Sequence, residues 1–372
     1  MSEEVQKTSS SVVAQPKKKR GKLFWTVALL ASALAMILTL FGFLHRVATK
    51  ARDVLRASGY VEEWTEGVDG ETLESISYGP CEWNKFDAFF PPQIEEDKSR
   101  CAIVYVHGGA WIGGRRRDMH GFARRATKKG YATASIEYLL YKEGENDSFY
   151  SIDVVLDEID AALVKLKETA AERGVTLERV ALCGDSAGGH IVSLYAYSRG
   201  KTAPVRVAFI APRVAPIDFH LDSWTPTLRP ATLARLVSGM ARCDEKITSE
   251  QIVKPNAEVE AYINSVSPLF YLTKETATPT VAAYGGKDPL VGTRHATKLT
   301  ERFRELGARP LSSVEADEDA VVFDTVEFPH SGHMLSDDPD CAQRYNELVW
   351  EYADRYLRDA RADANASSVD DE

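Results

Sequence analysis

Short apolar runs alternate with amphipathic stretches through most of the chain. Continuous apolar runs occupy 103–106, 131–136, 180–183, 205–210, 280–284 and 321–328. Between them, apolar residues recur at helical spacing in 152–172, 187–197, 294–306 and 339–357. Short buried strands that alternate with helices are typical of a mostly parallel sheet with helices on both faces. The pattern therefore predicts an α/β fold.

We place this α/β domain at residues 72–358. The interval 212–264 breaks the alternation with several prolines, Trp224 and a helical stretch. We interpret it as a lid or cap inserted into the domain. The last residues, 359–372, are rich in Ala, Asp and Ser, a composition that predicts a disordered tail.

The N-terminal region has a different pattern. Residues 1–22 are polar and end in a basic cluster, and the 22 residues from Leu23 to Leu44 carry no charge. As a helix, this run would be roughly 33 Å long, enough to cross a bilayer, and it exceeds the apolar region of a cleaved signal peptide. We predict a basic tail, a transmembrane helix at 23–44, and a juxtamembrane helix and linker at 45–71.

Charge and composition bear on location and partners. Basic residues flank the apolar run on both sides, with a small excess that favours a cytoplasmic N-terminus. We therefore expect a single-pass protein of an endomembrane or the plasma membrane, with its large domain in the lumen or outside the cell. Five scattered cysteines do not decide the compartment. The net charge of −10 argues against a nucleic-acid partner.

One glycine-rich turn carries the strongest chemical signal. Gly184-Asp185-Ser186-Ala187-Gly188 fits G-x-S-x-G between an apolar run and a helical stretch. Such a turn needs small neighbours and exposes the serine hydroxyl at the end of a strand, where the next helix offers free N–H groups. Ser186 is therefore the candidate nucleophile, and the N–H of Ala187 is a candidate donor to an oxyanion.

An earlier loop supplies the other candidate donors. His107-Gly108-Gly109-Ala110-Trp111 directly follows the apolar run 103–106. Glycines there would let backbone N–H groups face the oxygen that becomes negative when a carbonyl is attacked. We expect Gly108 and Gly109 to form the oxyanion hole together with Ala187.

A serine nucleophile needs a base, and the base needs a carboxylate that orients it. Asp288 follows the apolar run 280–284 in a glycine-rich loop and is the candidate acid. Two histidines follow the last run, and we favour His333 as the base because it follows a glycine and precedes the apolar Met334-Leu335 pair. His330 remains the alternative. Nothing in this set calls for a metal or a cofactor.

The elements HGGAW, GDSAGG, GGKDPL and GHML, in this order, resemble the α/β-hydrolase superfamily. More narrowly, they resemble its carboxylesterase branch with an HGG oxyanion loop, of the hormone-sensitive-lipase type. An apolar N-terminal segment before such a domain is also similar to isoprenylcysteine methylesterases. The resemblance covers about 72–357 and implies the α/β-hydrolase fold with nucleophile, acid and base in that order. Ala110 and the Glu137-Tyr138-Leu139-Leu140 segment depart from the branch's usual motifs.

These features predict a serine carboxylic-ester hydrolase that acts through an acyl-enzyme on a small-molecule ester. An adjacent membrane anchor favours a lipophilic or membrane-associated substrate. An amidase or arylformamidase would use the same residues and is an alternative. A non-catalytic binding protein with this fold is a second alternative, although such proteins usually lack part of the triad, and here each position is filled.

Overall fold

A computed structural model describes residues 46, 49–50, 52–56, 58–146, 148–243, 245–315 and 320–358. The chain divides into two compact units, Met1–Asp53 and Val54–Glu372, and the fold described below belongs to the second. The predicted basic tail, the predicted transmembrane helix at 23–44 and the predicted disordered tail at 359–372 lie outside the described residues. Among the helices that are described, none has the length and apolar character needed to cross a bilayer.

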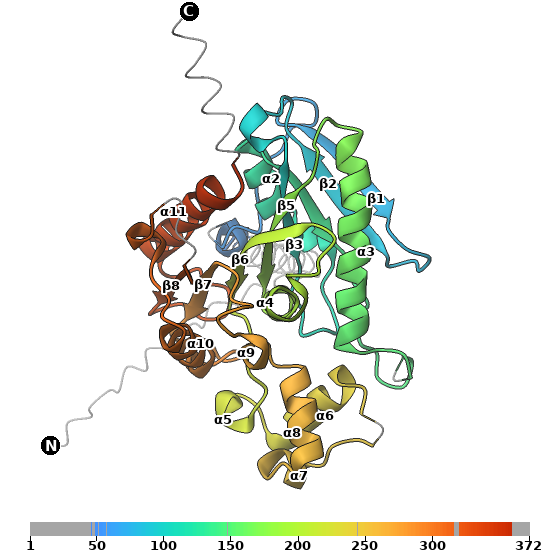
Figure 1. Ribbon diagram of the computed structural model, residues 1–372, viewed down its shortest axis with the longest axis vertical. Coiled ribbons are helices and arrows are strands. Elements are labelled where there is room, and N and C mark those ends of the chain that lie inside the picture. Colours follow the sequence, from blue (N-terminus) through green and yellow to red (C-terminus); the bar gives the residue numbers. More distant parts are fainter. Residues whose placement is uncertain are drawn as a thin grey trace, which may run out of the picture. The chain divides into compact units, whose positions relative to one another are not determined.

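An eight-stranded sheet forms the centre of the second unit (Figure 1). Its strands are β1 (Glu71–Ser77), β2 (Lys85–Phe90), β3 (Cys101–Val106), β4 (Ala132–Ile136), β5 (Arg179–Asp185), β6 (Arg206–Arg213), β7 (Thr280–Gly285) and β8 (Phe323–Phe328). Their order is β1-β2-β4-β3-β5-β6-β7-β8, and every pair from β4 to β8 is parallel. The predicted mostly parallel sheet is confirmed. The antiparallel strands β1 and β2 were not predicted.

Two helical layers cover the sheet. On one face lie α3 (Ile152–Ala171), α4 (Ala187–Arg199) and α10 (Thr293–Glu305), and on the other lie α2 (His120–Lys128) and α11 (Pro339–Tyr356). Alternate side chains of β3 serve the two layers: Val104 belongs to the core under α3 and α4, whereas Ile103 belongs to the core under α2 and α11. Apolar residues on both faces explain why the strands read as continuous apolar runs.

The expected insertion lies between β6 and β7. It contains α5 (Leu221–Trp224), α6 (Pro230–Met240), α7 (Ser249–Val253), α8 (Ala257–Ser265) and α9 (Pro268–Tyr271). In Figure 1, α5 to α8 gather beyond one end of the sheet. Because β6 continues to Arg213, the insertion begins after this residue rather than at 212. Side-chain caps from Thr248 and Asn256 begin α7 and α8. We call this segment, 214–271, the cap.

Three short 3-10 turns complete the described elements. They are η1 (Glu96–Lys98), η2 (Arg116–Met119) and η3 (Leu311–Ser313). The three arginines at 115–117, in and just before η2, each pair with a carboxylate. Arg115 pairs with Asp118, Arg116 with Asp87 and Glu137, and Arg117 with Glu74. Their charges are therefore balanced within the domain.

The stretch before residue 72 is predicted as a linker, but from Ser58 onward it packs into the second compact unit. The predicted domain boundary at 72 is therefore too late. Ser58 and Gly59 are buried. A helical turn ends where Gly59, at a φ of 89°, lets the Tyr60 N–H reach the carbonyl of Leu55 at 2.9 Å. An added Cβ on Gly59 would lie 2.7 Å from the ring of Phe122. This close packing fixes the segment, which we call the entry strap (58–60), against α2.

Two features bear on the compartment. The sequence contains two Asn-x-Ser triplets, the acceptor pattern for N-glycosylation, and the first begins at Asn146. The Asn146 side chain is buried and bonds to the Lys142 N–H and the Leu140 carbonyl. A bulky glycan would be attached at Nδ2, the atom that donates to Leu140, in a position that is buried, so this triplet does not support a lumenal domain. The second triplet begins at Asn365, outside the described residues. Cys81, Cys101, Cys183 and Cys341 have free thiols.

Candidate active site

Ser186 occupies the sharp turn between β5 and α4. Its φ of 54° and ψ of −118° lie outside the regions favoured by L-residues, a strain that persists only where surrounding contacts enforce it. The Ser186 N–H donates to the carbonyl of Arg213 at 2.8 Å. Added Cβ atoms on Gly184 and Gly188 would fall 2.4 Å from the Gly188 carbonyl oxygen and 2.1 Å from that of Val106. Only glycine therefore fits at positions 184 and 188.

Asp288 lies in the turn after β7 and is fully enclosed. Its Oδ1 accepts hydrogen bonds from the N–H groups of Leu290 at 2.8 Å and Val291 at 3.0 Å. Its Oδ2 lies 2.7 Å from Nδ1 of His333. The carboxylate side chain has no exposed area, and the imidazole keeps 19% of its area exposed. The contact fixes Nδ1 as the protonated nitrogen facing Asp288 and leaves Nε2 for a second partner.

The loops that carry this pair are joined to each other. The Lys287 N–H donates to the Ser331 carbonyl at 3.0 Å, and the Gly286 N–H donates to that of Phe328 at 2.8 Å. Since β5, β7 and β8 are parallel in one sheet, Ser186, Asp288 and His333 all follow carboxyl ends of strands at the same edge.

The alternative base, His330, has a different partner. Its Nδ1 lies 2.7 Å from Oδ1 of Asp338, and 70% of the side chain is exposed. Its N–H also donates to Asp338. Of the two histidines, the structure therefore brings only His333 to Asp288. In the described part of the chain, Ser186 and His333 are not hydrogen-bonded to each other. Such bonds are often long before substrate binds.

The loop after β3 lies directly against the nucleophile. An added Cβ on Gly108 would lie 2.8 Å from the Asp185 carbonyl oxygen and 3.2 Å from Cβ of Ser186. Gly109 has a φ of 122°, and an added Cβ there would lie 2.1 Å from the Gly113 carbonyl oxygen. Ala187 is the first residue of α4, where N–H groups have no acceptor within the helix. The structure thus places all three predicted oxyanion residues around Ser186.

Two side chains that sequence analysis did not single out hold this loop. Glu137 bonds to Nε2 of His107 at 3.1 Å and pairs with Arg116 at 3.3 Å. His190, one helical turn after Ser186, accepts from the Trp111 ring N–H at 3.1 Å and contacts the Val266 carbonyl of the cap at 2.8 Å. Burial lowers the pKa of His190 to about 4, so the ring is neutral at pH 7 and can accept and donate at once. The sequence signal that could have identified His190 is its position four residues after the nucleophile, on the same face of the following helix.

A cavity of about 490 Å³ opens over Ser186. Its walls come from the oxyanion loop, the segment before α3, the cap and the turn after Asp288. Apolar and aromatic side chains predominate, among them Trp111, Tyr141, Trp224, Leu236, Met240 and Val291. Ligand pockets are typically apolar with few polar groups, and this one contains the candidate nucleophile.

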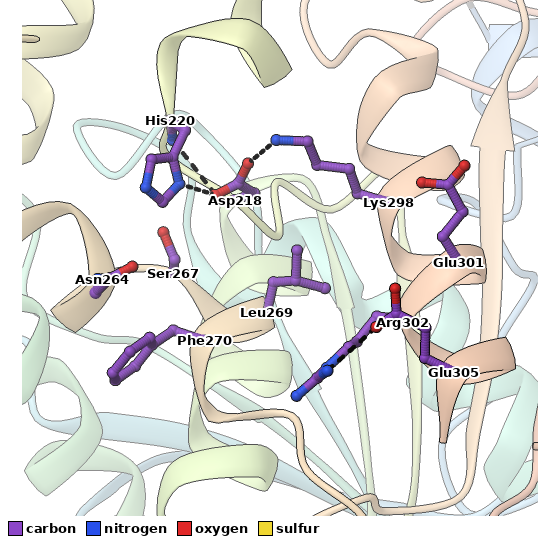
Figure 2. A pocket seen from close by; sticks show the side chains of 10 residues that line it. All are labelled: Asp218, His220, Asn264, Ser267, Leu269, Phe270, Lys298, Glu301, Arg302 and Glu305. Atoms are coloured by element: carbon purple, nitrogen blue, oxygen red, sulfur yellow. Dashed lines mark hydrogen bonds and ion pairs between the residues drawn. The ribbon is translucent and has the colours of Figure 1, made fainter. Parts of the chain in front are cut away.

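A second pocket, of about 360 Å³, lies where the cap meets α10 (Figure 2). Charged side chains line it, and Figure 2 shows His220 and Lys298 both directed at Asp218. None of the predicted catalytic residues lines this pocket. The candidate nucleophile, Ser186, lines the 490 Å³ cavity and not this pocket.

Comparisons with known proteins agree with this geometry. The BD-FAE family model matches residues 86–303, more than half of the chain. The chain is 29% identical over 232 residues to carboxylesterase NlhH of Mycobacterium tuberculosis, covering 61% of this chain and 60% of that protein. It is also 29% identical, over 33% of its length and 28% of the relative's, to a probable isoprenylcysteine alpha-carbonyl methylesterase of Oryza sativa.

Solved structures share the fold. Esterase B of Lactobacillus rhamnosis superimposes with a TM-score of 0.59 at 18% identity, covering 91% of this chain and all of that one. The chain spans about 60% of the length of the curated carboxylesterase named above. The family match, the esterase relatives and the shared fold together show that the chain belongs to the BD-FAE family, in the carboxylesterase branch of the α/β-hydrolases.

Proposed function

We propose that this protein is a serine carboxylic-ester hydrolase that acts through an acyl-enzyme. One observation carries the proposal: a strained Ser186 borders an apolar cavity, and the His333–Asp288 pair lies at the same edge of the sheet as Ser186. A strained serine, a base with one protonated nitrogen held by a carboxylate, and N–H groups around the serine are the parts that acyl transfer requires. The carboxylesterase relatives support the same reaction.

The proposed reaction has two halves. Oγ of Ser186 attacks the ester carbonyl carbon while its proton passes to Nε2 of His333. The N–H groups of Gly108, Gly109 and Ala187 bind the oxyanion. The C–O bond to the alcohol then breaks, and His333 gives its proton to the leaving oxygen. Water repeats the sequence on the acyl-enzyme, and the acid departs.

Labelling with a fluorophosphonate tests the serine directly. We expect a covalent adduct on Ser186 in folded protein and turnover of p-nitrophenyl esters. Ser186→Ala should abolish both without changing the thermal unfolding midpoint. A folded wild-type protein without an adduct would support the alternative of a non-catalytic binding protein. Turnover of matched amides in preference to esters would support the amidase alternative. This alternative is also supported by a 25% identity to rabbit arylacetamide deacetylase over 188 residues.

We infer that the substrate is lipophilic. The cavity walls are apolar, and two exposed apolar side chains, Ile112 with 64% and Leu290 with 56% of their area exposed, lie at its opening. Exposed apolar side chains beside an apolar pocket favour a ligand or surface that covers them. Activity should therefore rise with acyl chain length and in the presence of bilayers. Equal rates on short and long esters, with and without bilayers, would contradict this inference.

Anchoring in a membrane is a proposal from sequence. The uncharged run from Leu23 to Leu44 supports it, and this run lies outside the described residues. The full chain should stay in the membrane fraction after alkaline carbonate washing, whereas a chain without residues 1–44 should be released. Release of the full chain would contradict the anchor. Protease protection in sealed vesicles would then give the side of the membrane on which the hydrolase domain lies.

A further inference from the structure

One polar group in the substrate cavity has no partner. Tyr150 lies just before α3, where its N–H donates to the Asn146 carbonyl at 2.8 Å and its ring packs 5.1 Å from that of Tyr141. Its side chain lines the cavity over Ser186, although only 1% of the residue is exposed. Within the described part of the chain, its hydroxyl makes no hydrogen bond.

Other buried tyrosines in this fold do have partners. The hydroxyl of Tyr138 donates to the His107 carbonyl at 2.9 Å, and that of Tyr284 donates to the Ala215 carbonyl at 2.9 Å. Tyr197 pairs with the Thr280 hydroxyl at 2.9 Å. A buried hydroxyl without a partner costs stability, and such groups in native proteins usually serve a function. The position of this one, on the wall of the cavity, favours a ligand as its missing partner.

Apart from the Ser186 hydroxyl and the exposed Thr232, the polar side chains that line the cavity are already engaged. The ring N–H of Trp111 donates to His190, and that of Trp224 donates to the Asp218 carbonyl at 2.9 Å. Arg235 and Glu143 pair with each other at 3.6 Å, and more than half of each side chain is exposed. A ligand group deep in the cavity would therefore meet hydrocarbon and the Tyr150 hydroxyl, and the described lining residues offer no unpaired cation to balance a carboxylate.

The protonation state of Tyr150 makes it a donor. Burial raises the pKa of Tyr150, and Glu158 and Tyr141 act in the same direction. The phenol is therefore protonated throughout the neutral range. It can donate one hydrogen bond to an uncharged acceptor such as an ether or carbonyl oxygen.

We propose that Tyr150 selects esters in which the group that fills the cavity is mostly hydrocarbon but carries one uncharged acceptor oxygen. This inference rests on the proposed esterase function and names its substrate class. Tyr150 acts here as a specificity-determining residue, because it pairs with the bound group and not with the reacting carbonyl. A site built to hydrogen-bond one oxygen discriminates against an analogue that lacks it more strongly than an apolar wall discriminates by size.

The test compares isosteric esters. The first substrate is p-nitrophenyl hexanoate, and the others replace one methylene, at successive positions of the acyl chain, by an ether oxygen. The measured quantity is kcat/KM in the wild type divided by kcat/KM in Tyr150→Phe. This ratio cancels the intrinsic reactivity of each ester. A half-buried tyrosine outside the cavity, Tyr271, gives the control Tyr271→Phe; its hydroxyl donates to the Ser265 carbonyl at 3.4 Å.

For one oxygen position, we expect the ratio to be roughly 5- to 30-fold, the effect of one hydrogen bond to an uncharged acceptor. For the hexanoate, it should lie within about twofold of unity. Tyr271→Phe should give ratios near unity throughout. The proposal is overturned if Tyr150→Phe changes every ester equally or changes none.

The two proposals fail in different ways. If the wild type turns over the hexanoate and labels with fluorophosphonate but Tyr150→Phe shows no selectivity, the substrate inference fails and the esterase function stands. If no ester is turned over, the esterase function fails, and calorimetry of binding decides the Tyr150 question. The probes are then hexyl methyl ketone and the hydrocarbon of equal length. Tighter binding of the ketone to the wild type, lost in Tyr150→Phe, would retain Tyr150 as a donor; equal binding would overturn it.

Discussion

Nδ1 of His333 lies 2.7 Å from Oδ2 of Asp288, across two loops that follow neighbouring strands. The same carboxylate takes two backbone N–H groups on its other oxygen, so its orientation is fixed before any substrate binds. The exposed His330 is held by Asp338 instead. The structure thus supplies a way to separate the two histidines by experiment.

We predict that His333→Ala lowers kcat/KM for a p-nitrophenyl ester by roughly 10⁴-fold or more, as loss of a catalytic base does in other serine hydrolases. His330→Ala removes an exposed imidazole that contacts Asp338 and should leave kcat/KM within about threefold, since exposed contacts of this kind contribute little. Steady-state kinetics on both variants, with thermal unfolding as the folding control, measures this. If the two results were exchanged, His330 would be the base.

The oxyanion loop gives a steric prediction. Gly108→Ala places a methyl group 2.8 Å from the Asp185 carbonyl oxygen, closer than real contacts allow, so either the loop or the nucleophile turn must move. Moving one oxyanion donor costs about 10²- to 10³-fold in kcat in known enzymes, and we expect a similar loss here. In the neighbouring Gly113→Ala, the new methyl would lie 3.7 Å from its nearest atom, the Gly109 carbonyl oxygen. This control should keep kcat within a few-fold, and an equal loss in both variants would contradict the steric explanation.

The entry strap gives a stability prediction. The hydroxyl of Tyr60 donates to Oδ2 of Asp185, and Arg213 pairs with Oδ1 of the same carboxylate at 3.6 Å. Burial, with the adjacent Asp185, raises the pKa of Tyr60 well above its ordinary value, so the phenol stays protonated and donates. Tyr60→Phe leaves a buried carboxylate oxygen without this donor and should lower the free energy of unfolding by about 1.5–3 kcal/mol in urea denaturation.

The matched control for the strap is Tyr131→Phe. Tyr131 also faces an aspartate, but its hydroxyl is 3.5 Å from Oδ1 of Asp354, at the limit of a hydrogen bond. We expect this change to cost less than about 0.5 kcal/mol. Equal losses in the two variants would mean that Tyr60 acts through ring packing alone.

The cap gives a pH prediction. Nδ1 of His220 lies 2.6 Å from Asp218 and Nε2 lies 2.9 Å from Glu260, while Lys298 approaches Asp218 from α10 at 2.6 Å (Figure 2). The Asp218 hydrogen bond, with Glu260, raises the pKa of His220 to about 9. Since the folded pKa exceeds the unfolded value of about 6.5, this stabilisation is complete below pH ~6.5 and is lost as pH rises through ~9.

We therefore expect the titration of His220 to lower the free energy of unfolding of the wild type by on the order of 2 kcal/mol between about pH 6 and pH 10. This figure includes a discount for solvent screening, because about a third of the side-chain area is exposed. His220→Gln should show a shallower decline over this range. The measurement is urea denaturation of both proteins across the range. Parallel curves would show that His220 is not the titrating group.

Local motifs made most of the site predictable. Ser186, Gly108 and Asp288 each lie within three residues of the end of a strand, and short sequence patterns indicate strand ends well. The choice between the two histidines rested on a neighbouring glycine, whereas the feature that separates them in space is Asp338, in the turn before α11. A sequence pattern does not report which carboxylate a histidine meets after folding.

Contacts between distant segments were not predictable. The domain boundary was placed at residue 72 because the preceding stretch resembles a basic linker, yet Tyr60 finds its partner 125 residues away. The edge strands β1 and β2 run antiparallel and carry a mixture of polar and apolar residues. They therefore do not appear as continuous apolar runs in the sequence. The unpaired hydroxyl of Tyr150 was not predictable either, because the cap, the oxyanion loop and the segment before α3 enclose the cavity only in the folded chain.

The entry strap also decides where this protein can be shortened. Arg213 reaches back to the Ser58 carbonyl at 3.0 Å, and its guanidinium stacks 4.8 Å from the Phe122 ring centre. A recombinant chain that starts at β1 would lack the Ser58 carbonyl and the Tyr60 hydroxyl. The buried guanidinium of Arg213 and the carboxylate of Asp185, the residue before the nucleophile, would then each lose a hydrogen-bond partner that water cannot easily replace. Residue 54 is thus the latest sensible starting point for producing the hydrolase domain alone.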